Sequence, residues 1–303
     1  MTGVSRRRFL AISAAAFAAG PARGEEIFRW QGIALGARAS ITLAHPDARR
    51  ITARARAEID RLEDIFSLYR PRSALARLNR DGRLDNPPFE LLECLGLCGA
   101  IHAATGGAFD PTVQPLWALY AACAQSGTTP SADEIAGISQ RVGWENLRFD
   151  GGGVRFARPG MALTLNGIAQ GYIADRVAAM LRAEGLTDVM VDTGELHALG
   201  GRPGGGDRPV ALQAGGQRIP DAVHLRDRAL ASSAPTGTRI GTAGHILNPE
   251  TGRPAPSRWT LVSVAAPSAA IADGLSTAGC LMSRKAFARA VGGFAGAEIV
   301  HLA

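Results

Sequence analysis

Apolar and polar residues alternate along this chain with two periods, which predict helices and strands in a mixed order. Within residues 47–66 the apolar positions lie three or four residues apart, the spacing of a helix with one buried face. Residues 89–104 predict a second helix, which ends at the glycine pair 106–107. Ser131 and Glu134 have the spacing of a capping box, which predicts the start of another helix. The apolar positions of the first helix are Ile51, Ala55, Ile59, Leu62 and Phe66.

The strands predicted from the pattern are short and are separated by turn residues. Residues 147–156 place three glycines between two apolar runs and predict a β-hairpin. Residues 168–184 predict a helix that ends at Gly185. Hairpins and helices follow one another without a regular strand–helix–strand period, so we expect an α+β fold with a largely antiparallel sheet. Further strands are expected at residues 37–43, 161–165, 188–192, 210–213 and 260–265.

A glycine-rich segment at residues 200–206 contains five glycines. It precedes a predicted strand and opens no helix, so it lacks the context of a dinucleotide-binding fingerprint. We expect it to be a flexible hairpin loop.

Three oxygen-bearing side chains share one face of a predicted helix near the C-terminus. The helix follows a Pro-Ser start signal at residues 267–268. Asp273, Ser276 and Thr277 lie at positions i, i+3 and i+4, so they are neighbours on its surface. A carboxylate with two hydroxyls suits a hard cation such as Mg²⁺, or a phosphate held through one. The alternative is a helix whose polar side faces water.

The N-terminus has the pattern of an export signal. Arg6, Arg7 and Arg8 precede a run of small residues that is too short to span a bilayer. This twin-arginine pattern predicts a Tat signal peptide over residues 1–24, cleaved after Gly24, and one domain over residues 25–303. We therefore expect a soluble periplasmic protein.

Charge and cysteine content give no support for nucleic-acid binding, for a Cys/His metal site or for a disulfide between Cys94 and Cys98. Removal of the four arginines within residues 1–24 leaves 29 basic against 27 acidic residues, a balance that does not favour nucleic-acid binding. Cys94 and Cys98 have i, i+4 spacing, which is poor disulfide geometry, and no Cys/His metal spacing occurs. The four cysteines are expected to be small buried apolar residues.

Five segments, taken in order, carry a family resemblance that extends from about residue 30 to residue 285. Three of them contain the motifs Thr105-Gly106-Gly107-Ala108-Phe109-Asp110-Pro111, Leu165-Asn166-Gly167-Ile168-Ala169-Gln170-Gly171 and His245-Ile246-Leu247-Asn248-Pro249. The other two are residues 66–79 and the helix of Asp273. Together they resemble the ApbE family, the FAD:protein FMN transferases. The resemblance implies an α+β fold of the T-fold type, and transfer of FMN from FAD to a Ser or Thr of an acceptor flavoprotein, with Mg²⁺ and release of AMP.

The resemblance also implies roles for individual residues. Asp273 and Thr277, with Ser276 and the backbone carbonyl of Gly167, match the metal site. His245 matches a histidine close to the reacting diphosphate, and the catalytic pair is thus His245 with Asp273. The positions that match residues holding FAD, or that lie in the motif around it, are Leu35, Tyr69, Ala108, Phe109, Asp110, Thr164, Gln170 and Leu247.

General chemistry is compatible with these roles. Mg²⁺ stabilises the charge that builds on phosphoryl oxygens when a diphosphate is split. The N-terminus of the helix at residues 168–184 would offer N–H donors to phosphate. Tyr69 and Phe109 can stack on a flat ring, and the histidine can accept a proton from an acceptor hydroxyl.

Departures from the family pattern keep two other functions open. Where the family usually has Asp, Gly and Lys, this chain has Thr164, Asn166 and Gln170. In the same way, Thr193 replaces a glycine of the family pattern and Asn248 replaces an aspartate. These changes fit a divergent transferase or a non-catalytic flavin-binding accessory protein of electron transfer. An FAD pyrophosphatase that uses water as acceptor is a third alternative. The export signal, the lack of a lipobox cysteine and the altered motif resemble the NosX branch, which implies a NosR-like acceptor of nitrous oxide respiration.

Overall fold

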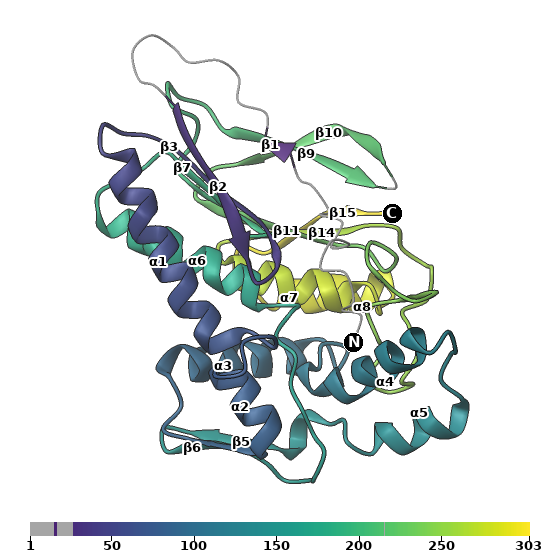
Figure 1. Ribbon diagram of the computed structural model, residues 1–303. Helices are drawn as coiled ribbons and strands as arrows, with labels where there is room; N and C mark the ends of the chain where they lie inside the picture. The colour runs from purple at the N-terminus through teal and green to yellow at the C-terminus, as the bar shows by residue number, and fades with distance from the viewer. Residues whose placement is uncertain (1–14, 17–26, 215) are drawn as a thin grey trace.

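An antiparallel sheet of seven strands forms the centre of the molecule in the computed structural model (Figure 1). The structure describes residues 15–16, 27–214 and 216–303, so the predicted signal peptide lies almost wholly outside the described residues. The strand order is β15-β14-β11-β8-β7-β3-β2, and every neighbouring pair is antiparallel. The strands are β2 (Ile27–Ala34), β3 (Ala37–Ala44), β7 (Val189–Asp192), β8 (Leu196–Leu199), β11 (Arg228–Ser233), β14 (Val262–Ala266) and β15 (Glu298–Leu302).

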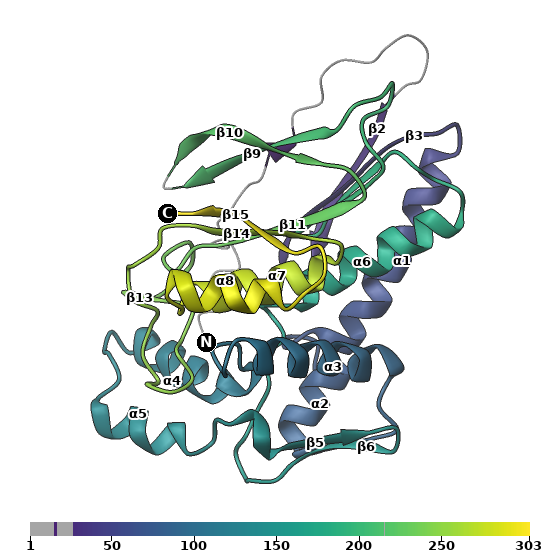
Figure 2. The same cartoon turned by 180° about the vertical axis from the view of Figure 1, so that it is seen from behind.

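Helices cover one face of this sheet and bury the main hydrophobic core. Helix α1 (Ala48–Phe66) packs on β2 and β3, α6 (Ala169–Ala183) on β7 and β8, and α7 (Ala269–Gly279) on β11 and β14. The apolar positions predicted for the first helix, from Ile51 to Phe66, are all buried. Helix α8 (Arg284–Gly292) runs beside α7 and leads into β15, as the view from behind shows (Figure 2).

The opposite face of the sheet is covered by a small sheet of three strands. It contains β1 (Ala15–Ala16), β9 (Arg208–Ala214) and β10 (Gln217–Leu225), in the order β1-β9-β10. Met190 and Leu196 of the large sheet pack there against Val210 and Leu212 in a second core. Helices therefore cover one face of the large sheet, and the small sheet packs on the other face at β7, β8, β11 and β14.

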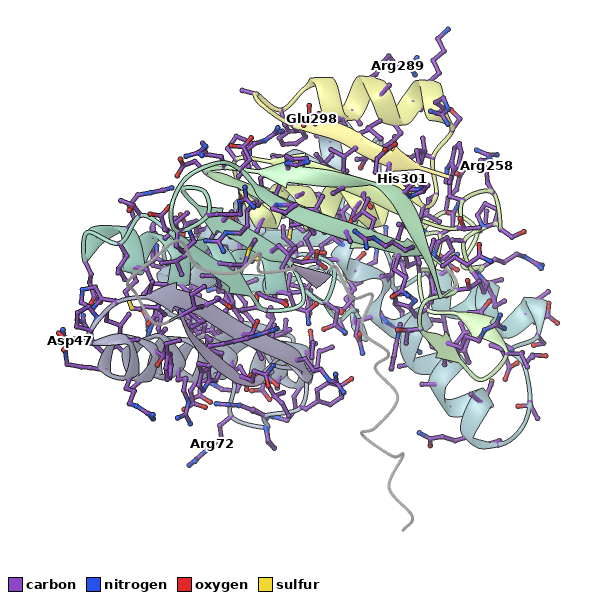
Figure 3. All side chains as sticks on the ribbon, turned by 90° about the horizontal axis from the view of Figure 1, so that it is seen from above. Asp47, Arg72, Arg258, Arg289, Glu298 and His301 are labelled. Atoms are coloured by element: carbon purple, nitrogen blue, oxygen red, sulfur yellow. The ribbon has the colours of Figure 1, made fainter. Side chains whose placement is uncertain are left out.

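A layer of helices and short strands lies below α6 and α7 in Figure 1. Its helices are α2 (Ala74–Asp81), α3 (Phe89–Ala104), α4 (Gln114–Gln125) and α5 (Ala132–Ser139), with 3-10 turns at Pro111–Val113 and Trp144–Asn146. Both bonds of the predicted capping box form at Ser131 and Glu134. The short strands are β4 (Arg83–Asp85), β5 (Leu147–Asp150), β6 (Gly153–Phe156), β12 (Arg239–Ile240) and β13 (Ala243–Gly244). Charged side chains at the edges of the molecule, such as Asp47, Arg72, Arg258 and Arg289, are exposed (Figure 3).

The α+β fold with a largely antiparallel sheet is confirmed, and three local predictions are wrong. Residues 161–165 form no strand, because the backbone of Leu163 bonds the side chain of Asn79 instead of a neighbouring strand. Residues 200–206 are not a hairpin loop, since they join β8 and β9, which belong to different sheets. Cys123 is half-buried, whereas the other three cysteines are buried, and all four are free.

Among the described helices, none has the length and apolar character needed to cross a bilayer.

Candidate functional site

One pocket of about 880 Å³ brings together almost all of the residues singled out in the sequence. It runs from the loops at residues 108–113 and 164–167, past the start of α6 and one side of α7, and along β2, β3 and β7. Of the predicted site residues, Ser276 does not line it. Those that do are Leu35, Tyr69, Ala108, Phe109, Asp110, Thr164, Gly167, Gln170, His245, Leu247, Asp273 and Thr277.

Asp273 is a buried carboxylate at the floor of the pocket. Its residue is only 3% exposed. Among the described residues a single hydrogen bond reaches the carboxylate, donated by the Gly171 N–H to Oδ2 at 3.3 Å. Loss of hydration raises the pKa of Asp273 to about 8, and the charge of Asp175 adds to the rise. The carboxylate thus retains acceptor capacity for a cation.

The position of Asp273 is set by a hydrogen-bond network at the start of α7. The hydroxyl of Ser268 caps this helix by accepting from the Ile271 N–H. The carboxylate of Asp175 on α6 accepts from the Ala269 N–H at 2.7 Å and from the Ser268 hydroxyl at 2.6 Å. Its Oδ1 also lies 2.7 Å from Nδ1 of His197 on β8. Three segments therefore fix the helix that carries Asp273.

The two hydroxyls predicted beside Asp273 have different surroundings. Thr277 faces the pocket, and a Cβ placed on Gly167 would be 3.0 Å from its Oγ1, so the Gly167 backbone lies against Thr277. Ser276 is fully buried, and its hydroxyl bonds Ser233 at 2.7 Å and the Asp273 carbonyl at 3.0 Å. Asp273 and Thr277 thus line the pocket, whereas the Ser276 hydroxyl is turned toward Ser233.

The donor set at this position fits a hard cation. No group of three or more His, Cys, Asp or Glu side chains with metal-binding geometry occurs in the part of the chain that the structure describes. One carboxylate, one hydroxyl and a nearby backbone carbonyl remain, all of them oxygen donors. Mg²⁺ takes few protein oxygens and retains several waters, so Asp273, Thr277 and Gly167 are suited to hold it.

Replacing Asp273 with asparagine is expected to stabilise the metal-free protein in mild alkali. The Asp273 carboxyl is protonated more readily in the folded protein, where its pKa is about 8, than in the unfolded chain, where its pKa is 3.8. Its contribution to the free energy of unfolding is therefore complete below pH 3.8 and is lost as the pH rises to about 8. The variant lacks this loss, so at pH 8.5 its Tm should exceed that of the wild type by about 3 °C or more, with little difference at pH 4. Thermal melts in a chelator measure this. Equal melting temperatures at pH 8.5 would contradict the burial argument.

His245 lies in the pocket wall with one ring nitrogen engaged. Its Nδ1 is 3.1 Å from the carbonyl oxygen of Thr238, which can only accept, so Nδ1 carries the proton. Burial lowers the pKa of His245, and the ring is therefore neutral near pH 7. Nε2 of this tautomer is a proton acceptor, as required of a general base.

The residues predicted to hold FAD form the outer and side walls of the pocket. Leu35 adopts a positive φ of 47°, and its N–H donates to Oε1 of Glu63 at 2.6 Å. Tyr69 is 63% exposed at the rim, so its ring is free to cover a ligand. Phe109 is 5% exposed and lies deeper. Asp110 lines the pocket, but its carboxylate accepts from Thr112 and from the Trp144 N–H, so it mainly holds its own loop.

The altered motif leaves neutral groups on the pocket wall. The Thr164 N–H donates to the Pro111 carbonyl at 2.8 Å, which fixes the backbone at this residue. Gln170 lies against Gly194, where a Cβ would be 2.8 Å from its side-chain carbon. The φ of Gly194 is +106°, so both the conformation and the close contact favour glycine there.

Two further carboxylates in the pocket were not identified from the sequence. Glu195 is half-buried, and its Oε2 accepts from the Ser232 N–H at 3.2 Å. Burial and the charges of Asp273 and Asp192 raise the pKa of Glu195 well above its ordinary value. Asp192 also lines the pocket, and burial raises its pKa too. The only sequence signal was the position of Glu195 after Thr193-Gly194, where the family usually has two glycines.

In fold, the chain is similar to solved structures of ApbE proteins. The Pseudomonas stutzeri flavinyl transferase ApbE in its apo form superposes with a TM-score of 0.78 at 26% identity, covering 88% of each chain. The ApbE protein of Thermotoga maritima gives a TM-score of 0.78 at 27% identity, covering 91% of this chain and 94% of that one.

Sequence comparison defines the family. The ApbE family model matches residues 35–298. The FAD:protein FMN transferase of Klebsiella pneumoniae (strain 342) is 30% identical over 252 residues, 76% of this chain and 70% of that protein. The enzyme of that name from Chlamydia trachomatis serovar D is 30% identical over 256 residues, covering 79% and 78%. The chain belongs to the ApbE family, and it is therefore a member of a family of enzymes.

Proposed function

We propose that this protein transfers FMN from FAD to a Ser or Thr hydroxyl of an acceptor flavoprotein, with Mg²⁺ as the metal and AMP as the leaving group. The observation that carries the proposal is the buried carboxylate of Asp273, which shares one pocket with Thr277, Gly167 and His245. The family relatives named as FAD:protein FMN transferases support the same activity.

Each group at the pocket floor has a separate task in this proposal. Asp273, Thr277 and the Gly167 carbonyl hold Mg²⁺, which when bound neutralises charge on the phosphoryl oxygens. Helix α6 begins at Ala169 beside the same point and directs the positive end of its dipole toward phosphate. Nε2 of His245 accepts the proton of the acceptor hydroxyl, which then attacks the FMN phosphorus. Tyr69, at the rim, covers the flavin ring.

The cellular setting forms part of the proposal. The twin arginines at Arg6 and Arg7 and the small residues before Glu25 support export by the Tat route and a soluble form in the periplasm. A NosR-like flavoprotein is the acceptor that the NosX-like traits favour.

A second candidate function is a flavin-binding protein without transferase activity. The observation in its favour is the neutral wall formed by Thr164 and Gln170, where the family usually has Asp and Lys. It implies flavin that stays bound and an acceptor that stays unmodified. An FAD pyrophosphatase would instead release free FMN and AMP in the absence of any acceptor.

The intact mass of an acceptor domain tests the proposal. We expect the periplasmic flavin domain of a NosR-like protein to gain the mass of one FMN after incubation with this protein, FAD and Mg²⁺. A characterised transferase, run in parallel, shows that the domain is competent. If that control modifies the domain and this protein does not, the transferase proposal is overturned. Chromatography of FAD incubated without acceptor separates the pyrophosphatase alternative, because a transferase should then turn over little FAD.

A further inference from the structure

The pocket has a second polar region, away from α7, where two arginines meet. Arg208 at the start of β9 and Arg202 in the preceding loop both line it, together with Asp188 at the start of β7. None of the residues assigned to flavin or metal belongs to this group. The proposed transfer reaction therefore leaves these two guanidinium groups without a role.

Arg208 is buried without a full set of partners. The residue is 8% exposed, so more than nine-tenths of it is removed from solvent. One Nη2 hydrogen bond reaches the Gly201 carbonyl at 2.7 Å, but Nε is buried with no partner. Arg208 belongs to no salt bridge among residues 27–214 and 216–303. Burial lowers the pKa of Arg208, and Arg202 lowers it further, whereas Asp188 opposes the change.

Arg202 is positioned by the glycine-rich loop. Its N–H donates to the Gly206 carbonyl at 3.0 Å, and its carbonyl accepts from the Gly205 N–H at 2.9 Å. A Cβ on Gly206 would lie 3.0 Å from Nη2 of Arg202, so the guanidinium group lies over this glycine. The φ of Gly206 is +79°, which favours glycine. The Nε of Arg202 is also buried and unpaired.

The local charges do not balance. Asp188 is the carboxylate on the pocket wall near the pair, and it forms no salt bridge with either arginine in the described part of the chain. Asp207, on the same loop, is bound to Arg226 at 2.8 Å. Burying a guanidinium group with open donors is costly, and an oxyanion that accepts from both groups would remove that cost.

We infer that Arg202 and Arg208 form an oxyanion subsite, which takes a phosphate or carboxylate group at the end of the pocket remote from Asp273. The unpaired Nε atoms of the two guanidinium groups suit the planar, two-point recognition of such groups. This inference goes beyond the proposed transfer reaction and holds whether or not the protein modifies an acceptor. A phosphate of a nucleotide and a carboxylate of an acceptor protein share the required chemistry.

Binding of inorganic phosphate to the purified protein, without metal, tests the subsite. Isothermal titration is made on the wild type, Arg202→Ala, Arg208→Lys and Arg226→Ala. We expect Arg202→Ala and Arg208→Lys each to weaken phosphate binding about tenfold, the loss of one charge-assisted hydrogen bond. Arg226→Ala is the matched control, because this arginine contacts the same loop but is already paired with Asp207. It should leave phosphate affinity unchanged.

The outcomes separate the subsite from other anion sites. Phosphate affinity that is equal in all four proteins overturns the inference. Should Arg208→Lys fail to fold, Arg202→Ala, in an exposed loop, decides alone.

A second titration with FAD present identifies the source of the oxyanion. If FAD excludes phosphate and loses affinity in Arg202→Ala, the arginines take the diphosphate of FAD, and the placement of that diphosphate at Asp273 is overturned with it. If phosphate and FAD bind together, it takes a carboxylate or phosphate from another molecule.

Discussion

Replacing Asp273 with alanine is expected to lower the rate of FMN transfer about a thousandfold, because the metal loses its only carboxylate from the proposed set. Asp273 is 3% exposed and its carboxylate has one hydrogen-bond partner among the described residues, so its remaining acceptor capacity is free for the metal. The rate is measured as the mass gained by the acceptor domain with time at saturating FAD and Mg²⁺.

The control for this variant is another aspartate in a different environment. Asp85 on β4 is exposed, and its contact with Arg155 is at 3.8 Å, so Asp85→Ala should transfer FMN at the wild-type rate. Comparison of Thr277→Val with Ser276→Ala then identifies the hydroxyl that serves the metal. Thr277→Val is expected to raise the Mg²⁺ concentration needed for half-maximal rate more than Ser276→Ala does. An Asp273→Ala protein with wild-type activity would refute the assigned metal site.

Replacing Gly171 with alanine is expected to destabilise the fold by about 3 kcal/mol, because α6 and α7 pack there with no space for a side chain. A Cβ at this position would lie 2.3 Å from the carbonyl oxygen of Ala269 and 2.7 Å from the Ala270 nitrogen. Both atoms belong to backbone, so they cannot rotate away as a flexible side chain would. Urea unfolding followed by circular dichroism measures the change.

Gly96 provides the matched control for this prediction. It lies in α3, is exposed, and a Cβ there would meet no atom within 4 Å. Gly96→Ala should therefore stabilise the protein by up to about 1 kcal/mol, since alanine is the better helix former. If both variants unfold at the wild-type urea concentration, the close contact between α6 and α7 is not present in solution.

Local sequence patterns predicted much of the fold because they depend on neighbours in the chain. The helix at residues 47–66 was found from its apolar period, and the start of α7 from the cap at Ser268. The error at residues 161–165 has a non-local cause. The side chain of Asn79, 84 residues earlier in the chain, both donates to and accepts from the backbone of Leu163. An apolar run does not show which partner its backbone will find.

The same distinction applies to the candidate site. The i, i+3, i+4 spacing placed Asp273, Ser276 and Thr277 on one helix face, but it could not show that Ser276 turns toward Ser233. Glu195 and Arg208 were missed because their burial comes from elements elsewhere in the chain. The family resemblance supplied most of the flavin-side residues, and the pocket contains all of those named.

The cap of α7 has a consequence for the order of events during synthesis. Asp175 bonds Ala269, 94 residues later, and the Gly171 N–H bonds Asp273, 102 residues later. A growing chain therefore has no pocket floor until α7 has been synthesised, whatever its earlier helices have done. Products that stop before α7 cannot capture a ligand at this floor, so ligand binding there would distinguish chains that contain α7 from chains that lack it.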